Sequence, residues 1–193
     1  MLSSKGRYLD NKGFFLLEIL LSVSLICILL SSVYSIVRFT YNTTMQSDEI
    51  DTALLNGRYA IEYIKDEVMS ADKIYFSSRF TNLDYNYPKN IGFVIMEKEL
   101  KFGNGKIDSI NYNYRTYYQK NDELIRIAYN TPNDSLFEGN LFSGHNQICS
   151  GIISFEDSNL DIGNNVVNLS IHMAQGNGSL SLETTINLRC PIE

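Results

Sequence analysis

A long apolar stretch between Lys12 and Arg38 constrains this 193-residue chain more than any other feature. About two dozen residues lie between these two cations, and nearly all of them are apolar. At about 1.5 Å of rise per helical residue, they can cross the roughly 30 Å hydrocarbon core of a bilayer. Lys5, Arg7 and Lys12 are opposed before the stretch only by Asp10, so the positive-inside rule places the N-terminus in the cytoplasm. The sequence therefore predicts one membrane span, with the rest of the chain outside the cytoplasm.

A single carboxylate interrupts this apolar stretch. Glu18 lies a few residues inside it, and an ionised side chain at mid-bilayer costs about 2.5–3.5 kcal/mol or more. One interpretation is a plain signal anchor, in which the acid is close enough to the helix end to reach the headgroups. The other is that the carboxylate pairs with a cation, because a buried charge is tolerable only when it is paired.

The order of residues around Glu18 is that of a processing signal. A short basic leader is followed by Gly13, by Phe14 and, four residues later, by Glu18. This order resembles the class III signal of type IV prepilins and pseudopilins. The resemblance implies that a membrane-embedded prepilin peptidase cuts between Gly13 and Phe14 and methylates the new N-terminus. Glu18 would then pair with the α-ammonium group of a neighbouring subunit when subunits assemble into a filament.

Residues 39–72 predict an amphipathic helix that continues the apolar one. Apolar side chains recur at spacings near three and four from Ile50 to Ala71, and most charged side chains lie between them. Gly57 lies on the apolar stripe, where the missing side chain lets a packed neighbour approach closely. Residues 40–44 are poor helix formers, so a softer section is expected between the two halves.

Beyond Ser70 the pattern becomes that of β-strands. Seven short runs are rich in β-branched or aromatic residues and are separated by turn sequences such as Gly103-Asn104-Gly105. The last two runs alternate as a hairpin with one buried face. The polar segments 77–89 and 130–146 are predicted to be loops. The predicted strands are Lys73–Phe76, Ile91–Met96, Ile107–Tyr118, Glu123–Tyr129, Ile148–Phe155, Val166–Met173 and Ser179–Leu188.

These patterns together predict an α+β protein in which a long N-terminal helix packs on an antiparallel sheet. With the leader resemblance, they divide the chain into a leader peptide (1–13), a transmembrane or filament-core helix (14–38), an amphipathic helix (39–72) and an extracytoplasmic β-sheet domain (73–193). The later part resembles minor pilins of the PilW type and J-type pseudopilins of type II secretion, through a tyrosine-rich strand at residues 110–114 and a strand ending in Leu124-Ile125-Arg126. Arg126 is either an exposed strand cation or the partner in a salt bridge.

Charge and cysteine content limit the partners. The chain has 22 acidic and 16 basic residues and a formal charge of −6, so nucleic acid is not the default partner. Cys27 falls in the predicted span, whereas Cys149 and Cys190 fall in the part predicted to be extracytoplasmic. A bridge between those two would close a loop of about 40 residues and contribute about 3–4 kcal/mol. The alternative is two buried free thiols.

No other motif predicts a catalytic or cofactor site. His145 and His172 are not at metal-ligand spacing from each other or from a cysteine. Glu156, Asp157 and Asp161 lack the spacing of a calcium-binding loop and predict an ordinary loop. We therefore expect no metal, no cofactor and no enzymatic activity.

The resemblance implies a structural function. It predicts a minor pilin or pseudopilin that helps to initiate or cap a type IV pilus, or a pseudopilus of secretion or competence. Its partners would be other pilin subunits, prepilin peptidase, the assembly platform and the membrane, and its location the bacterial cytoplasmic membrane and then the filament. An alternative is a tip-displayed adhesive or DNA-binding module that acts through tyrosines of residues 82–87, and replacement of Tyr85 and Tyr87 would abolish such binding.

Overall fold

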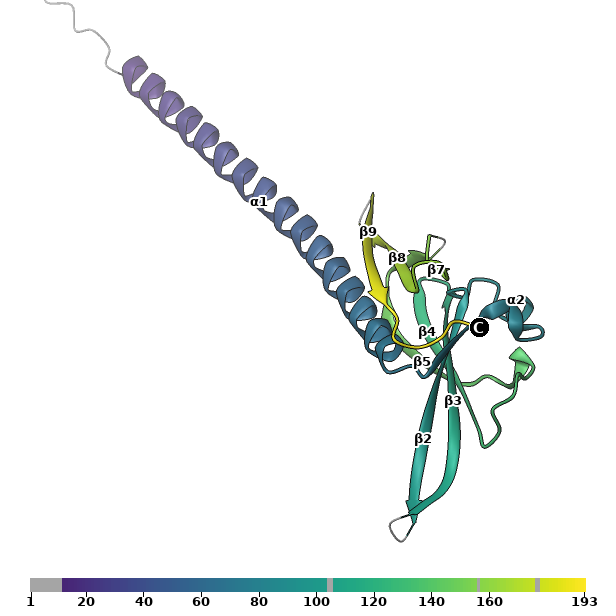
Figure 1. Cartoon of the computed structure of the whole chain (residues 1–193). Coiled ribbons are helices and arrows are strands. Elements are labelled where there is room, and N and C mark those ends of the chain that lie inside the picture. Colours follow the sequence, from purple (N-terminus) through teal and green to yellow (C-terminus); the bar gives the residue numbers. More distant parts are fainter. Residues whose placement is uncertain (1–11, 104–105, 156, 176–177) are drawn as a thin grey trace, which may run out of the picture. The chain divides into compact units, whose positions relative to one another are not determined.

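The computed structural model describes residues 12–103, 106–155, 157–175 and 178–193 (Figure 1). The chain divides into two compact units, of which the first ends at Ser47 and the second comprises Asp48–Glu193. Helix α1 (Lys12–Met69) is followed by antiparallel strands, which confirms the α+β class. The predicted amphipathic segment 39–72 falls on both sides of the division at Ser47.

Helix α1 has no break at residues 40–44, where the sequence predicts a softer section. The hydroxyl group of Thr43 donates a hydrogen bond to the carbonyl oxygen of Phe39, at 2.9 Å. This bond satisfies the hydroxyl group within the helix, so the side chain does not compete with the helical backbone bonds of its own turn. The poor helix formers are therefore accommodated within α1.

The first sheet contains five antiparallel strands in the order β1–β2–β3–β4–β5. All five were predicted in part, although β2 and β3 extend further toward their shared turn and β5 begins inside the predicted loop 130–146. Their bounds are β1 (Lys73–Phe76), β2 (Phe93–Gly103), β3 (Lys106–Lys120), β4 (Glu123–Thr131) and β5 (Ser143–Ser150).

The second sheet is built around β8 (Val166–Gln175). β9 (Gly178–Asn187) pairs with one edge of β8, and β6 (Ile152–Ser154) and β7 (Asn159–Asp161) pair with the other. The hairpin of β8 and β9 was predicted, whereas β7 was not. The predicted strand Ile148–Phe155 was wrong as a single element, because the chain passes from the first sheet to the second at Gly151. Its φ of +83° favours glycine.

The main core joins part of α1 to both sheets within the second unit. Ala53, Ala60, Ile64 and Val68 of the helix are buried in one cluster with side chains from each sheet. At Gly57, a Cβ atom would overlap Cδ1 of Leu182 and lie 3.1 Å from Cγ of Met173. The predicted close approach at Gly57 is therefore confirmed, and β8 and β9 supply the neighbour. The other buried members are Ile61, Ile74, Ile91, Phe93, Ile95, Tyr117, Leu124, Cys149, Ile152, Phe155, Val167, Leu169, Ile171, Met173, Ile186, Leu188 and Cys190.

A second, aromatic core covers the other face of the first sheet. Phe93 and Ile95 of β2 belong to the main core, whereas Val94 and Met96 belong to this second core, as the alternation of a strand requires. The predicted loops 77–89 and 130–146 cover it and contain the short helices η1 (Ser77–Arg79), α2 (Leu83–Asn86) and η2 (Gly139–Leu141). Their anchors in this core are Phe80, Leu83, Phe137 and Phe142.

Residues 191–193 cover the outer edge of β1. The amide of Ile74 donates to the carbonyl of Pro191, and the amide of Glu193 donates to the carbonyl of Ile74, at 3.1 and 2.8 Å. The ammonium group of Lys73 lies 3.1 Å from the side-chain carboxylate of Glu193, and this contact raises the pKa of Lys73. This edge of the first sheet is therefore occupied by the chain itself.

Candidate functional site

Residues 14–38 of helix α1 are apolar enough to lie in a membrane. Within the described part of the chain, α1 is the one helix that is long and apolar enough to span a bilayer. Its polar groups bond internally, since five serine hydroxyl groups donate to the carbonyl four residues earlier. Such bonds satisfy hydroxyl groups where no water is available. The serines are Ser22, Ser24, Ser31, Ser32 and Ser35.

Glu18 and Phe14 lie four residues apart on α1, and therefore on the same face of the helix. The side chain of Glu18 is exposed, and no cation among the described residues pairs with it. Gly13 is helical, as is Lys12, while Lys5 and Arg7 lie outside the described residues. Within the described residues, Glu18 is thus an acid without an ionic partner on an exposed apolar helix.

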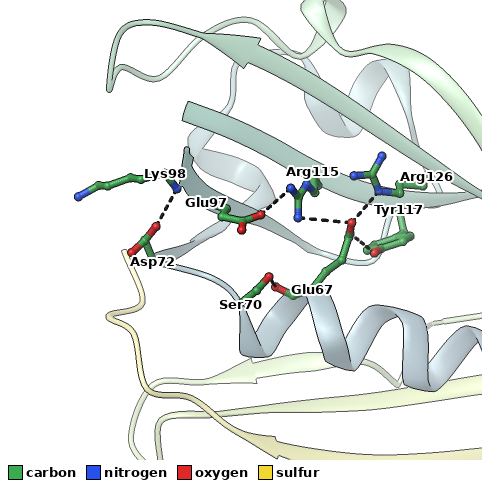
Figure 2. A network of polar contacts seen from close by, with 8 residues as sticks. All are labelled: Glu67, Ser70, Asp72, Glu97, Lys98, Arg115, Tyr117 and Arg126. Carbon is green, nitrogen blue, oxygen red and sulfur yellow. Dashed lines mark hydrogen bonds and ion pairs between the residues drawn. The ribbon is translucent and has the colours of Figure 1, made fainter. Parts of the chain in front are cut away.

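The second unit contains a dense polar cluster where the C-terminal end of α1 meets the first sheet (Figure 2). Glu67 points from the helix toward three groups on β3 and β4. Its Oε1 lies 2.9 Å from Nε of Arg126 and 3.5 Å from Nη1 of Arg115, and Tyr117 donates its hydroxyl proton to Oε2. Nη2 of Arg115 also lies 2.5 Å from Oε2 of Glu97 on β2. We call these five side chains the Glu67 network.

The formal charges of the Glu67 network cancel. Two carboxylates face two guanidinium groups, and the side chains of Glu67, Arg115 and Arg126 are only 13, 16 and 14% exposed. Burial, and then the adjacent Glu67 carboxylate, holds the pKa of Tyr117 well above its ordinary value. Tyr117 is therefore a neutral donor at physiological pH. A compensated cluster of this kind fixes the position of the helix on β3 and β4.

The same region holds the connection from α1 to β1. The hydroxyl group of Ser70 donates to the carbonyl of Glu67 at 3.0 Å, beside the helix end at Met69. Oδ2 of Asp72 accepts the backbone N–H of Lys98 at 2.7 Å, and the amide of Asp72 donates to the carbonyl of Met96 at 2.9 Å (Figure 2). The chain is thus tied to β2 as it leaves the helix.

The salt-bridge interpretation of Arg126 is confirmed. Sequence reasoning missed its partner Glu67, and it also missed Arg115 and Tyr117. A signal for Glu67 was present, because this acid lies on the apolar stripe of the helix, next to Val68 and three residues after Ile64. An acid on a stripe that packs against a sheet needs a cation on the sheet.

The two cysteines of the second unit lie in the main core. Cys149 and Cys190 are free, buried thiols in the structure, and Cys27 is exposed on α1. Burial raises the pKa of the Cys149 thiol to about 11 and also raises the pKa of the Cys190 thiol. A raised pKa disfavours the thiolate, which is the reactive form. The Cys149–Cys190 bridge stays a prediction.

The tyrosines proposed for surface binding differ in their surroundings. Tyr85 is 86% exposed, whereas Tyr87 is half-buried with its ring centroid 4.8 Å from that of Tyr118. The hydroxyl group of Tyr87 donates to the carbonyl of Phe142 at 3.4 Å, and His145 lies beside the same pair of rings. Tyr87 is therefore partly buried against the second core, and Tyr85 is the more exposed of the two tyrosines.

His172 lies in a small polar cluster on the second sheet. Its Nε2 is 2.9 Å from Oδ2 of Asp157 and 3.5 Å from Oγ of Ser170. A catalytic triad uses different ring nitrogens for its serine and its acid, and here both groups contact the same one. The cluster thus lacks triad geometry. Over the described ranges, no three His, Cys, Asp or Glu side chains could hold a metal ion together, and Glu156 lies outside those ranges.

No protein-family description, curated protein or solved structure matches the chain significantly. The fold, with its long apolar helix and antiparallel sheets, is compatible with that of a pilin.

Proposed function

We propose that this chain is a minor pilin or pseudopilin, a membrane-anchored subunit that helps to initiate or cap a type IV pilus or a related pseudopilus. The observation that carries the proposal is an acid on an exposed apolar helix that has no ionic partner in the part of the chain that the structure describes. Glu18 lies one helical turn beyond Phe14, and the residue before Phe14 is glycine. A simple anchor has no use for a carboxylate there, because it adds an energetic cost without a compensating contact.

Assembly with other subunits supplies the missing contact. Cleavage after Gly13 creates an α-ammonium group on Phe14, at the tip of the helix. When the helices of neighbouring subunits lie side by side, the ammonium group of one can reach Glu18 of another. The pair offsets the desolvation of both charges and forms only in the correct register. The exposed apolar side chains of residues 14–38 would exchange lipid contacts for contacts with other helices.

The second unit supports a structural rather than an enzymatic function. The Glu67 network is charge-compensated and joins the helix to the sheet, so its groups are occupied with each other. This arrangement suits a domain that must stay fixed to its helix.

The test is the N-terminal residue of the mature protein, made in cells that contain a prepilin peptidase. We expect mass spectrometry to find an N-methylated Phe14, and a Gly13→Leu variant to keep the full leader. Gly6→Ala, which changes the other glycine of the leader, should leave processing unchanged. A native protein that begins at Met1 would overturn the proposal.

The role of Glu18 is tested separately by incorporation into filaments. Glu18→Ala should be processed and inserted but absent from sheared filaments. Ser22→Ala is the matched control, because the hydroxyl group of Ser22 donates to the carbonyl of Glu18 within its own helix. Equal incorporation of the two variants would refute the charge pairing.

A further inference from the structure

The far end of the β2–β3 hairpin is a ribbon of two strands with both edges open. β1 pairs with β2 only as far as Met96, and β4 pairs with β3 only from Tyr112 onward. In the described part of the chain, residues 99–103 and 106–111 therefore pair only with each other (Figure 1). We call them the distal ribbon. An isolated two-stranded hairpin is marginally stable in water, and an open edge is a template for a further strand.

A hydrogen bond at Lys98 shows which backbone groups of β2 point away from β3. The N–H of Lys98 donates to Asp72, on the side away from β3. In an antiparallel strand, residues two apart direct their backbone groups to the same side. The pairing of β2 with β3 is regular from Lys98 to Leu100. The N–H and C=O groups of Leu100 consequently point away from β3. They lie two residues beyond Lys98, whose N–H is bonded to Asp72.

We propose that this edge pairs with the same edge of a second copy of the chain, in an antiparallel arrangement centred on Leu100. A two-fold axis at Leu100 places Glu99 of each copy opposite Lys101 of the other. Both side chains are exposed, and neither has an ionic partner among the described residues. The strand edge is thus self-complementary in charge, as a two-fold interface requires.

The register also places these charges in the closer of the two kinds of cross-strand pair. Because the backbone groups of Leu100 point outward, the Leu100–Leu100 pair is hydrogen-bonded and the flanking Glu99–Lys101 pairs are not. Side chains approach most closely in pairs that are not hydrogen-bonded. Moving the axis to Glu99 or to Lys101 would eliminate both ion pairs. Only the register centred on Leu100 therefore uses both charges.

The pairing would also extend an apolar face. Leu100, Phe102 and Ile110 are 44, 69 and 38% exposed. Leu100 is directly opposite Ile110, and Phe102 is two residues further along β2, so all three share one face of the ribbon. Met96 and Tyr114 lie on the same face nearer the sheet, in the second core. Two copies would join their apolar faces into one four-stranded surface.

This inference does not rest on the proposed function, since it needs neither cleavage at Gly13 nor a filament. The first test is disulfide trapping in the full-length chain, purified in detergent with Cys27→Ser as background. The Cα atoms of a hydrogen-bonded pair are about 5.5 Å apart, within the range of a disulfide. Leu100→Cys should form a covalent dimer under mild oxidation. Ser109→Cys, on β3 of the same ribbon, is the matched control and should stay monomeric.

The second test reverses the charges. Glu99→Lys places like charges opposite each other twice, so the dissociation constant of the dimer should rise roughly tenfold. Glu99→Lys combined with Lys101→Glu restores opposite charges and should restore the affinity, measured by sedimentation in the same detergent. Equal trapping of Leu100→Cys and Ser109→Cys, or a double variant as weak as the single one, would overturn the inference.

Discussion

Neutralising Glu67 should destabilise the second unit through the charge it leaves behind. Glu67→Gln preserves the shape of the side chain, but among the described residues it leaves Arg115 paired with Glu97 and Arg126 with no carboxylate. Removing one partner costs about 3–5 kcal/mol in a buried ion pair and about 0–1 kcal/mol in an exposed one. Glu67 is 13% exposed and Arg115 keeps its contact with Glu97, so we expect a loss of about 2–4 kcal/mol in the free energy of unfolding.

The assay is urea unfolding of the full-length chain in detergent, followed by near-ultraviolet circular dichroism. The chain has 13 tyrosines and no tryptophan, so this signal reports tyrosine packing. Glu62→Gln is the matched control, because Glu62 is exposed and, in the described part of the chain, its ionic partner is Lys65 one turn along the same helix. It should change the free energy of unfolding by less than about 0.5 kcal/mol.

A double variant distinguishes lost charge compensation from lost packing. Glu67→Gln combined with Arg126→Gln returns the Glu67 network to formal neutrality. Its loss of stability should therefore be smaller than the sum of the two single losses, by about 0.5–3 kcal/mol. Additive losses, or a Glu67→Gln variant as stable as Glu62→Gln, would refute the assignment of a compensated buried cluster.

Three further predictions concern single residues. Because the pKa of Tyr117 is raised in the folded state, the contribution of Tyr117 to stability is present below about pH 10 and is lost as pH rises through the folded-state pKa. Tyr117→Phe should therefore lose less unfolding free energy than the unmodified chain as pH rises, and an equal loss would contradict this assignment. Gly57→Ala should cost about 1 kcal/mol in urea unfolding, since overlap with Leu182 outweighs the gain in helix propensity, and Gly57→Ala with Leu182→Ala should cost less than the two changes added. Cys149 should resist maleimide at pH 8 in the folded protein and react after denaturation without reductant, and a denatured chain unlabelled at both Cys149 and Cys190 would instead establish the bridge.

The elements of this fold were predictable where one local pattern determines them. The periodicity after Ile50 predicts the helix and the side that is buried from Ala53 to Val68, and the alternation in the last two strands predicts a hairpin with one buried face. The position of Gly57 on the stripe predicts a close contact, because only one neighbour is involved.

The connections between distant parts of the chain were not predictable in this way. Glu67 is separated by 50 residues from Tyr117 and by 59 from Arg126. No local sequence pattern predicts which cation contacts an acid so far away in the chain. The change from the first sheet to the second at Gly151 was missed because the residues on both sides of it have the pattern of a single strand. The positive φ of Gly151 turns the chain toward the second sheet. Segment 77–89 was predicted as a loop, but its packing against the second core was not, because its anchors Phe80 and Leu83 are isolated apolar side chains in a polar stretch.

The Glu67 network also has a mechanical consequence. A pulling force applied to this end of α1 would be delivered to β3 and β4 together, because Glu67 holds Tyr117, Arg115 and Arg126 at once. These two strands lie inside the five-stranded sheet, so neither can peel away as an edge strand would. Tension on this end of the helix is therefore borne by the interior strands of the sheet and not by an edge strand.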